Sequence, residues 1–163
     1  KNITNLEIEI LNNELIVIFD GSNLTNKLRS EKTAKSASEL SALKDTRTNL
    51  LGIQRGLNNE LALIADGRDM GTVVFPNAGN KFFLTASSEI RAKRRYLELQ
   101  NRGQEVNMPD LIADIESRDL KDRTRTISPL KPAEDSIVID SSNMSLDEVL
   151  SFTKKLTKKE FNK

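Results

Sequence analysis

Three short apolar runs, interspersed with segments of helical pattern, constrain the fold more than any other feature of the sequence. The runs are LALIAD (61–66), KFFLTA (81–86) and SIVID (136–140). Their length and apolar continuity are typical of parallel strands that are buried on both faces. Helical patterns cover 88–102, 108–124 and 145–161, and the last opens with the capping-box spacing Ser145-Leu-Asp-Glu148. Strands alternating with helices predict an α/β fold with a parallel sheet and right-handed crossovers.

The first sixty residues follow a different pattern. LEIEIL (6–11) and LIVIFDG (15–21) flank Asn12-Asn13, which predicts a β-hairpin. A segment rich in Ser and Lys follows, from 23 to about 44, and it has too few apolar residues to form a core. Asp45 then begins a predicted helix that ends near residue 57, with an apolar stripe along one side.

Composition excludes several classes of protein. The 163 residues are 37% hydrophobic and 30% charged, with a net charge of +1, so we expect a globular chain with a core rather than a disordered or polybasic one. The absence of cysteine and histidine excludes a disulfide framework, a zinc enzyme and a Ser-His-Asp hydrolase. No apolar run approaches the roughly 20 residues of a membrane span, and the N-terminus lacks the apolar core of a secretory signal. We therefore expect a cytoplasmic protein.

Charged residues follow directly after the first apolar run, in the stretch IADGRDMGTVVFP (64–76). Ligands of parallel sheets bind at the C-terminal ends of the strands, so Asp66, Arg68 and Asp69 are expected to lie in a site. The fork of donors on arginine suits a phosphate, and an ionised aspartate can accept hydrogen bonds from an amine. From the residues alone, a turn at the end of a strand with a local ion pair explains this stretch equally well.

A second group of charges lies in ESRDLKDRTR (116–125). On a helix, Arg118, Asp122 and Arg125 fall at i, i+4 and i+7, which places them on one stripe. Two arginines separated by a carboxylate could clamp a charged ligand. A solvent-exposed face with weak salt bridges is the alternative, and for this segment in isolation it is the favoured interpretation.

A third group comprises Arg91, Arg94 and Arg95, within about one and a half helical turns. It could be a basic patch that binds RNA, with strongly salt-dependent affinity, or a mobile arm that covers phosphates. The low net charge argues against an extended nucleic-acid track. Convergent arginines without histidine, cysteine or an obvious nucleophile suggest phosphoryl transfer, which requires mainly positioning and charge neutralisation.

Long stretches of the chain resemble the bacterial cytidylate kinases. IADGRDMGTVVFP, FFLTASSEIRAKRR and ESRDLKDRTRTISPLKPAEDSIVIDSS agree with that family in order, spacing and intervening length. LIVIFDGSNLTNKLRSEKTAKSASELSALKDTRT is similar to the insert with which the family binds nucleoside monophosphates. The resemblance covers about Leu6 to Leu156, and DGRDMGTVVFP and RDxxDRxR are its specific motifs. It implies the P-loop nucleoside-monophosphate-kinase fold, a parallel sheet flanked by helices. Residues 1–60 would form the insert and a connecting helix, and 61–163 the α/β core, with a lid around 88–125.

The resemblance also implies a reaction and roles for individual residues. The enzyme would transfer the γ-phosphoryl group of ATP to CMP or dCMP, giving CDP or dCDP. Arg68 and Arg118 would bind the phosphate of the acceptor. Asp69, Ser38 and Arg47 would read the cytosine edge, because cytosine offers an exocyclic amine to a carboxylate whereas uracil offers a carbonyl oxygen.

The remaining implied roles concern the sugar, the donor and the transferred group. Asp122 would hold a sugar hydroxyl, and Arg29 would add a contact from the insert. Arg125, with Arg94 or Arg95 of the lid, would neutralise the phosphoryl group in transfer. The loop near the adenine of ATP is expected to include Ser128, Pro129 and Lys131. Asp66 would organise Mg²⁺, through water. We expect a monomer that binds neither nucleic acid nor membranes.

The front of the sequence departs from the family. Such kinases begin with a strand, the loop G-x-x-x-x-G-K-[ST] and a helix, which cradle the phosphates of ATP. None of the seven glycines here is followed by another five positions later. We therefore expect that the sequence is the C-terminal three-quarters of a longer chain, without the first strand and the P-loop. Such a piece would be inactive while retaining some affinity for CMP. A non-catalytic pyrimidine-nucleotide-binding fragment is the alternative function.

Overall fold

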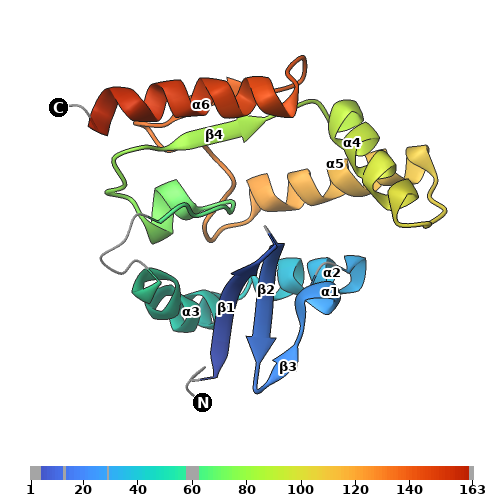
Figure 1. The fold of residues 1–163 in the computed structure, drawn as a ribbon, viewed down its shortest axis with the longest axis horizontal. Helices are drawn as coiled ribbons and strands as arrows, with labels where there is room; N and C mark the ends of the chain where they lie inside the picture. Colours follow the sequence, from blue (N-terminus) through green and yellow to red (C-terminus); the bar gives the residue numbers. More distant parts are fainter. Residues whose placement is uncertain (1–4, 13, 29, 58–62, 162–163) are drawn as a thin grey trace. The chain divides into compact units, whose positions relative to one another are not determined.

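The computed structural model describes residues 5–12, 14–28, 30–57 and 63–161 (Figure 1). The chain consists of two compact units, Lys1–Leu50 and Leu51–Lys163. The boundary between the units lies within helix α3 (Lys44–Gly56). The domain boundary predicted after residue 60 falls outside the described residues.

The first unit opens with an antiparallel sheet in the order β1-β2-β3 (Leu6–Leu11, Glu14–Phe19 and Ser22–Asn23). The register pairs Leu6 with Phe19 and Leu11 with Glu14, which confirms the predicted hairpin. Asn12 has a φ of 52°, a left-handed conformation that asparagine tolerates. At the next turn Asp20 and Gly21 both have positive φ, as a tight two-residue hairpin turn requires.

Three helices complete this unit: α1 (Thr25–Leu28), α2 (Glu31–Leu40) and the first part of α3. The predicted helix from 45 to 57 agrees with α3 within one residue at each end. The hydroxyl of Ser30 caps α2 by accepting from the N–H of Thr33 at 3.2 Å. Thr25 is buried and accepts from the N–H of Val17, whereas no described apolar side chain of this unit is fully buried. The unit therefore lacks an apolar core of its own among the residues described.

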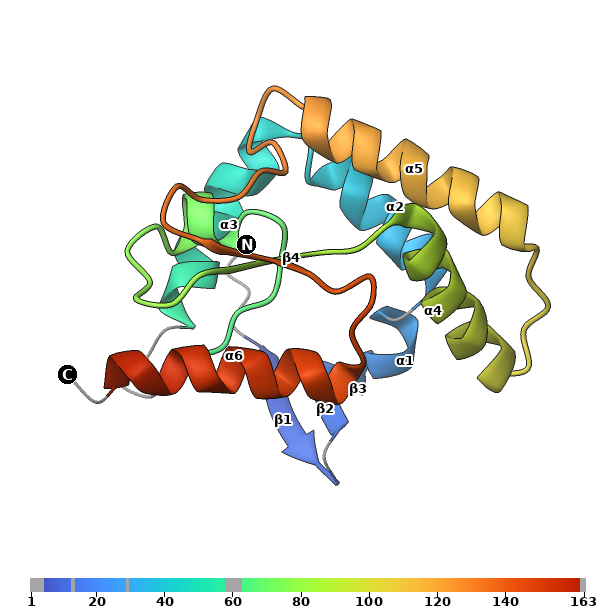
Figure 2. The ribbon, with the colours of Figure 1, turned by 90° about the horizontal axis from the view of Figure 1, so that it is seen from above.

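The second unit contains a parallel pair of strands, β4 (Phe82–Thr85) and β5 (Ile137–Asp140), with Phe82 opposite Ile137 and Thr85 opposite Asp140. Between them along the chain come α4 (Ser88–Asn101) and α5 (Met108–Thr124), which lie side by side in Figures 1 and 2, and α6 (Leu146–Phe161) follows. Two predicted strands and all three predicted helices are thus confirmed. The core includes Val74, Ala86, Ala92, Leu99 and Ile139.

The third predicted strand, over 61–66, is not observed. Residues 61 and 62 lie outside the described part of the chain, and residues 63–66 belong to no strand. The side chain of Ile64 is 98% exposed and that of Leu63 is 42% exposed, so the expectation of burial on both faces is wrong here. A strand exists only through its hydrogen-bonded neighbours, and none of the described strands pairs with this segment.

Local sequence signals explain where α4 ends and where α6 begins. Gly103 has a φ of 72°, and its N–H and that of Gln104 donate to Gln100 and Leu99, which closes α4 with a Schellman motif. The predicted capping box of α6 is confirmed, because Glu148 accepts from the N–H of Ser145 at 2.7 Å and Ser145 accepts in return at 3.3 Å. Within the described ranges, every helix is too short or too polar to cross a membrane.

Candidate active site

The charged stretch after residue 65 leads into an unusual turn. Met70–Val74 form a π-helix, η1, in which the N–H of Val74 donates to the carbonyl oxygen of Asp69 at 3.2 Å. Asp69 thus lies directly before the helix, and it is only 7% exposed. The side chain of Arg68 remains 42% exposed. Because π-helices are rare and occur frequently at functional sites, this turn is a good candidate for part of one.

Asp122 pairs with two arginines, one that is distant in the sequence and one that is three residues away. The Nε of Arg68, 54 residues earlier in the chain, donates to Oδ2 of Asp122. The Nη1 of Arg125 donates to Oδ1 at 3.3 Å. Asp122 is 3% exposed and the side chain of Arg125 is 9% exposed. The interpretation of this stripe as a solvent-exposed face is therefore wrong for these two residues, which form the centre of a buried ionic group.

Arg118 lies one helical turn before Asp122, on the same stripe of α5. Its Nε is buried and has no hydrogen-bond partner among the residues that the structure describes. A buried donor without a partner is unfavourable, so an acceptor from outside the protein would be stabilising at this point. Arg68 and Arg125 thus pair with the buried carboxylate of Asp122, and Arg118 adds a third guanidinium group one helical turn away on the same helix. The surplus of positive charge and the forked donors suit a phosphate.

The loop after α5 is tied to the same ionic group. The carbonyl oxygen of Ser128 accepts from Nε of Arg125 at 2.5 Å, and the N–H of Leu130 donates to the carbonyl oxygen of Asp122 at 2.8 Å. Ser128 has a φ of 48°, which is uncommon for a residue other than glycine. Pro129 is half-buried and Lys131 is exposed. The three predicted contacts to ATP thus follow directly after the arginine group.

The arginines of α4 have partners within the protein. Arg91 makes a two-point ion pair with Asp119, at 3.0 Å and 2.5 Å, and also donates to the carbonyl oxygen of Ala86. Arg94 donates to the carbonyl oxygens of Ser141 and Met144, at 2.5 Å and 3.2 Å, and to the hydroxyl of Ser141.

Arg95 completes the group on α4, and it pairs with Glu98 at 2.7 Å. A second contact between α4 and α5 lies beside the Arg91–Asp119 pair, where the hydroxyl of Ser88 donates to Glu116 at 2.9 Å. These contacts fasten α4 to α5 and to the segment after β5. They do not bring Arg94 or Arg95 into the ionic group around Asp122.

The C-terminal ends of β4 and β5 are linked by serine hydroxyls. The hydroxyl and the N–H of Ser142 donate to Asp140, at 2.6 Å and 2.9 Å, and these bonds hold the pKa of the Asp140 carboxyl below its usual value. The same hydroxyl accepts from the N–H of Ser87. Asp140 therefore stays ionised at the strand ends, the edge at which ligands of parallel sheets bind.

The predicted metal contact, Asp66, lies on the surface beside the arginine group. It is exposed, two residues before Arg68. Across the described ranges no group of three or more acidic side chains is arranged to hold a metal ion. The role of Asp66 at a metal ion therefore stays a prediction.

Three predicted contacts belong to the first unit. Ser38 lies in α2 and is half-buried. Arg47 lies in α3, where its Nε donates to the carbonyl oxygen of Ser41. Arg29 falls outside the described residues. Nothing in the geometry of this unit assigns these side chains to a ligand, so their roles stay predictions.

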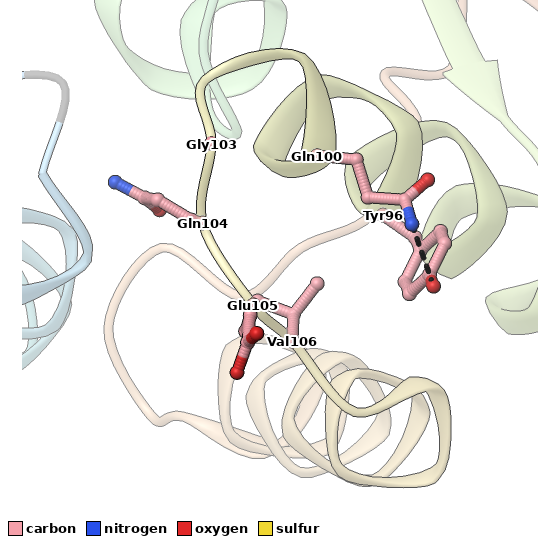
Figure 3. A pocket seen from close by; sticks show the side chains of 6 residues that line it. All are labelled: Tyr96, Gln100, Gly103, Gln104, Glu105 and Val106. Carbon is pink, nitrogen blue, oxygen red and sulfur yellow. Dashed lines mark hydrogen bonds between the residues drawn. The ribbon is translucent and has the colours of Figure 1, made fainter.

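One open hollow of about 530 Å³ lies at the turn between α4 and α5 (Figure 3). Its rim includes Tyr96 and Gln100, whose side chains share a hydrogen bond of 2.8 Å. None of the predicted site residues lines it. We therefore place the candidate active site at the arginine group and not at this hollow.

Sequence reasoning missed two cations that brace the turn after Arg68. Arg55, in α3, donates to the carbonyl oxygens of Val73 and Val74, at 3.0 Å and 2.9 Å. Lys81 donates to the carbonyl oxygen of Pro76 and to Asp135, both at 2.5 Å, and this pairing lowers the pKa of the Asp135 carboxyl. No spacing in the sequence relates these residues to the turn, so no signal in a single sequence could have found them.

Comparison with known proteins identifies the family. The family model described as Cytidylate kinase matches residues 1–159. The chain is 45% identical to the cytidylate kinase of Pasteurella multocida (strain Pm70), in an alignment that covers 90% of this chain and 65% of that protein. The identity to the enzyme of Haemophilus ducreyi (strain 35000HP / ATCC 700724) is also 45%, over 93% of this chain and 68% of the relative.

The cytidylate kinase of Photobacterium profundum is 50% identical over 82% of this chain and 58% of its own length. The chain thus spans between 58% and 68% of the length of these three relatives. The family match includes both the first unit and the arginine group around Asp122. The chain belongs to the cytidylate kinase family.

Proposed function

We propose that the protein acts as a nucleoside monophosphate kinase, which transfers the γ-phosphoryl group of ATP to CMP or dCMP and releases ADP with CDP or dCDP. The observation that carries this proposal is the ionic group of Arg68, Asp122 and Arg125, together with the buried Nε of Arg118 one helical turn before Asp122. Phosphoryl transfer depends on positioning and on neutralising charge, and this group supplies both.

The phosphate of the acceptor would lie between Arg68 and Arg118. Arg68 is already held by Asp122 through its Nε, which leaves the Nη atoms of its half-exposed side chain for a ligand. Arg118 brings a buried donor that lacks a partner among the described residues. Asp122 accepts one hydrogen bond at each oxygen, so it retains lone pairs for the sugar hydroxyl that the resemblance assigns to it.

The base would be read by Asp69, whose carboxylate is buried before η1. Cytosine offers an amine to this carboxylate, whereas uracil would leave the buried group facing a carbonyl oxygen. For Ser38, Arg47 and Arg29 a role in binding CMP rests on the family resemblance alone.

Charge on the transferring group would be neutralised chiefly by Arg125, whose side chain is 9% exposed and pairs with Asp122. Arg95 and Arg94, on α4, are further candidates. For Arg94 this role requires an exchange, because it would have to give up its bonds to Ser141 and Met144 in order to reach a phosphate.

ATP would be contacted by the loop containing Ser128, Pro129 and Lys131, which the bonds to Arg125 and Asp122 hold at the site. Mg²⁺ would be held mainly by the nucleotides and water, with Asp66 as an outer contact. The bound ion supplies charge neutralisation and orientation of the phosphates. We further propose that the protein works in the cytoplasm as a monomer, without binding nucleic acid or membranes.

The alternative function is a pyrimidine-nucleotide-binding module, which would bind CMP at the arginine group without performing phosphoryl transfer.

The test is a coupled assay of ADP formation with CMP, dCMP and UMP, together with calorimetric titration of the same nucleotides. Turnover with CMP and dCMP, and little with UMP, is the expected result. Binding of CMP without turnover would favour the module. If the protein neither binds nor phosphorylates CMP, both functions are contradicted.

A further inference from the structure

The turn that presents Asp69 depends on contacts from outside itself. The π-helix η1 has five residues, Met70–Val74, and is closed by hydrogen bonds from Val74 to Asp69 and from Phe75 to Met70, at 3.2 Å and 2.7 Å. So short a helix is not stable in isolation, and the π form is less favourable than the α form. Its geometry must therefore be held by neighbouring groups.

Two side chains pack against the two glycines of this turn. A Cβ at Gly67 would lie 3.0 Å from the end of the Met70 side chain, and one at Gly71 would lie 3.3 Å from the side chain of Lys81. Each glycine thus permits a close contact that restricts how the turn can move. The Lys81 contact is made from outside η1, at its second residue, whereas Met70 is itself the first residue of η1.

The C-terminal end of η1 is held by Arg55. Its Nε donates to the carbonyl oxygen of Val74 at 2.9 Å and its Nη2 to that of Val73 at 3.0 Å. These are carbonyl groups at the end of the helix, where hydrogen-bond donors and positive charge are both stabilising. The planar fork of arginine reaches two adjacent acceptors at once, which the point-like ammonium of lysine cannot reproduce.

We propose that Arg55 is a specificity-determining positioning residue, which fixes η1 and thereby the carboxylate of Asp69 that separates cytosine from uracil. This inference rests on the proposed function, because it takes Asp69 as the reader of the base. Arg55 does not need to touch the nucleotide. It limits the adjustment by which the turn could accommodate a carbonyl oxygen in place of an amine.

The discrimination between CMP and UMP is the direct readout, measured by calorimetry as the ratio of the two dissociation constants. Arg55→Lys keeps the charge and loses the fork, and we expect it to lower the preference for CMP by about three- to tenfold, the size of one or two ordinary hydrogen bonds. The matched control is Arg102→Lys, because Arg102 lies at the C-terminal end of α4, much as Arg55 lies in the last turn of α3, and pairs with Glu98 on the surface. The control should leave the ratio unchanged.

Asp69→Asn supplies a second arm, since it removes the proposed reader itself. If Arg55 acts through Asp69, adding Arg55→Lys to Asp69→Asn should change the ratio no further. The inference would be overturned if Arg55→Lys weakened the binding of CMP and of UMP equally, or left the ratio of their dissociation constants unchanged. Full additivity of the two substitutions would overturn it as well.

Amide hydrogen exchange at Val73, Val74 and Phe75 tests the brace without any ligand. Arg55→Lys should accelerate exchange at these positions while the control does not, and equal rates would refute the brace. If the wild type binds CMP and UMP equally while Arg55→Lys accelerates the exchange, the proposed reading of the base is refuted and the brace is not. The failure of one proposal is thereby distinguished from the failure of the other.

Discussion

Two arginine-rich segments of the second unit differ in their surroundings. Arg118 lies on α5 and Arg125 directly follows it, where it pairs with the buried Asp122; Nε of Arg118 has no hydrogen-bond partner among the residues described. On α4, Arg91 and Arg94 donate to Asp119, Ser141 and other groups of the protein itself. The first group retains capacity for a ligand, whereas the second uses its donors to join elements of the fold. The density of arginines in a sequence therefore does not distinguish a binding site from a structural contact.

The largest expected effect is that of Arg118→Ala. Because truncation removes a buried charged donor from the proposed phosphate site, we expect the affinity for CMP to fall about 100-fold, in the range measured for buried charged contacts. The free energy of unfolding should change little, because the protein loses a buried donor that has no described partner. Titration with CMP and urea unfolding measure the two quantities.

Arg91→Ala is the contrasting variant on α4 and should have the opposite profile, with a lower free energy of unfolding and nearly normal affinity. If Arg91→Ala weakens CMP binding more than Arg118→Ala does, the distinction between the two groups is wrong.

Asp122→Asn tests the centre of the first group. The substitution keeps the shape of the side chain and removes the charge that two arginines share. We expect the free energy of unfolding to fall by about 2 kcal/mol, below the 3–5 kcal/mol typical of breaking a fully buried pair, because the Arg68 side chain is 42% exposed. Urea unfolding at neutral pH gives the value. Asp114→Asn is a suitable control, since Asp114 is an exposed residue of the same helix. An equally stable Asp122→Asn would show that this carboxylate is dispensable for the fold.

How far the sequence predicts these features depends on whether the cause is local. The α4, α5 and α6 helices, the strands β4 and β5 and the capping box at Ser145 follow from periodicity and from signals within a few residues. The segment 61–66 has the composition of a buried strand, but strand formation depends on a pairing partner that its composition does not specify.

The candidate site shows the same division. The placement of Arg118 and Asp122 on one stripe follows from helical spacing, whereas Arg125 lies just past the end of α5 in an extended conformation. The contact of Arg68 with Asp122 joins residues 54 positions apart, and the family resemblance assigned both residues to the site without predicting this contact. Arg55 and Lys81 brace the turn through backbone carbonyls, which any sequence possesses, so their partners could not be read from side-chain identity.

The Arg91–Asp119 pair tests whether the second group is structural. Its two parallel hydrogen bonds join α4 to α5, and the Arg91 side chain is 34% exposed. A double-mutant cycle with Arg91→Ala and Asp119→Ala should give a coupling energy of about 1 kcal/mol in the free energy of unfolding, as expected for a well-formed but partly exposed pair. The cycle of Arg95 and Glu98, a neighbouring pair within one helix, should give a smaller coupling. Equal couplings would mean that the contact between α4 and α5 adds nothing beyond a surface ion pair.

The smallest effect concerns a carboxylate that has no part in either group, Glu148 in the capping box of α6. The N–H and the hydroxyl of Ser145 donate to it and lower its pKa. A carboxyl whose pKa is lower in the folded state stabilises the fold at pH values above its unfolded pKa, and this contribution is lost as the pH falls through the folded pKa.

The stability difference between the wild type and Glu148→Gln should therefore be small and constant near neutral pH, and should diminish as the pH falls below about 4.5. Glutamine can still accept at this position, which keeps the neutral-pH effect small. Urea unfolding at several pH values measures it, with Asp147→Asn as a control that removes a carboxylate from the same turn but not the contact to Ser145. A difference that grows on acidification would have the wrong sign for an ionised cap, and would place the acid sensitivity of the fold elsewhere, with the carboxylates Asp135 and Asp140 as the next to test.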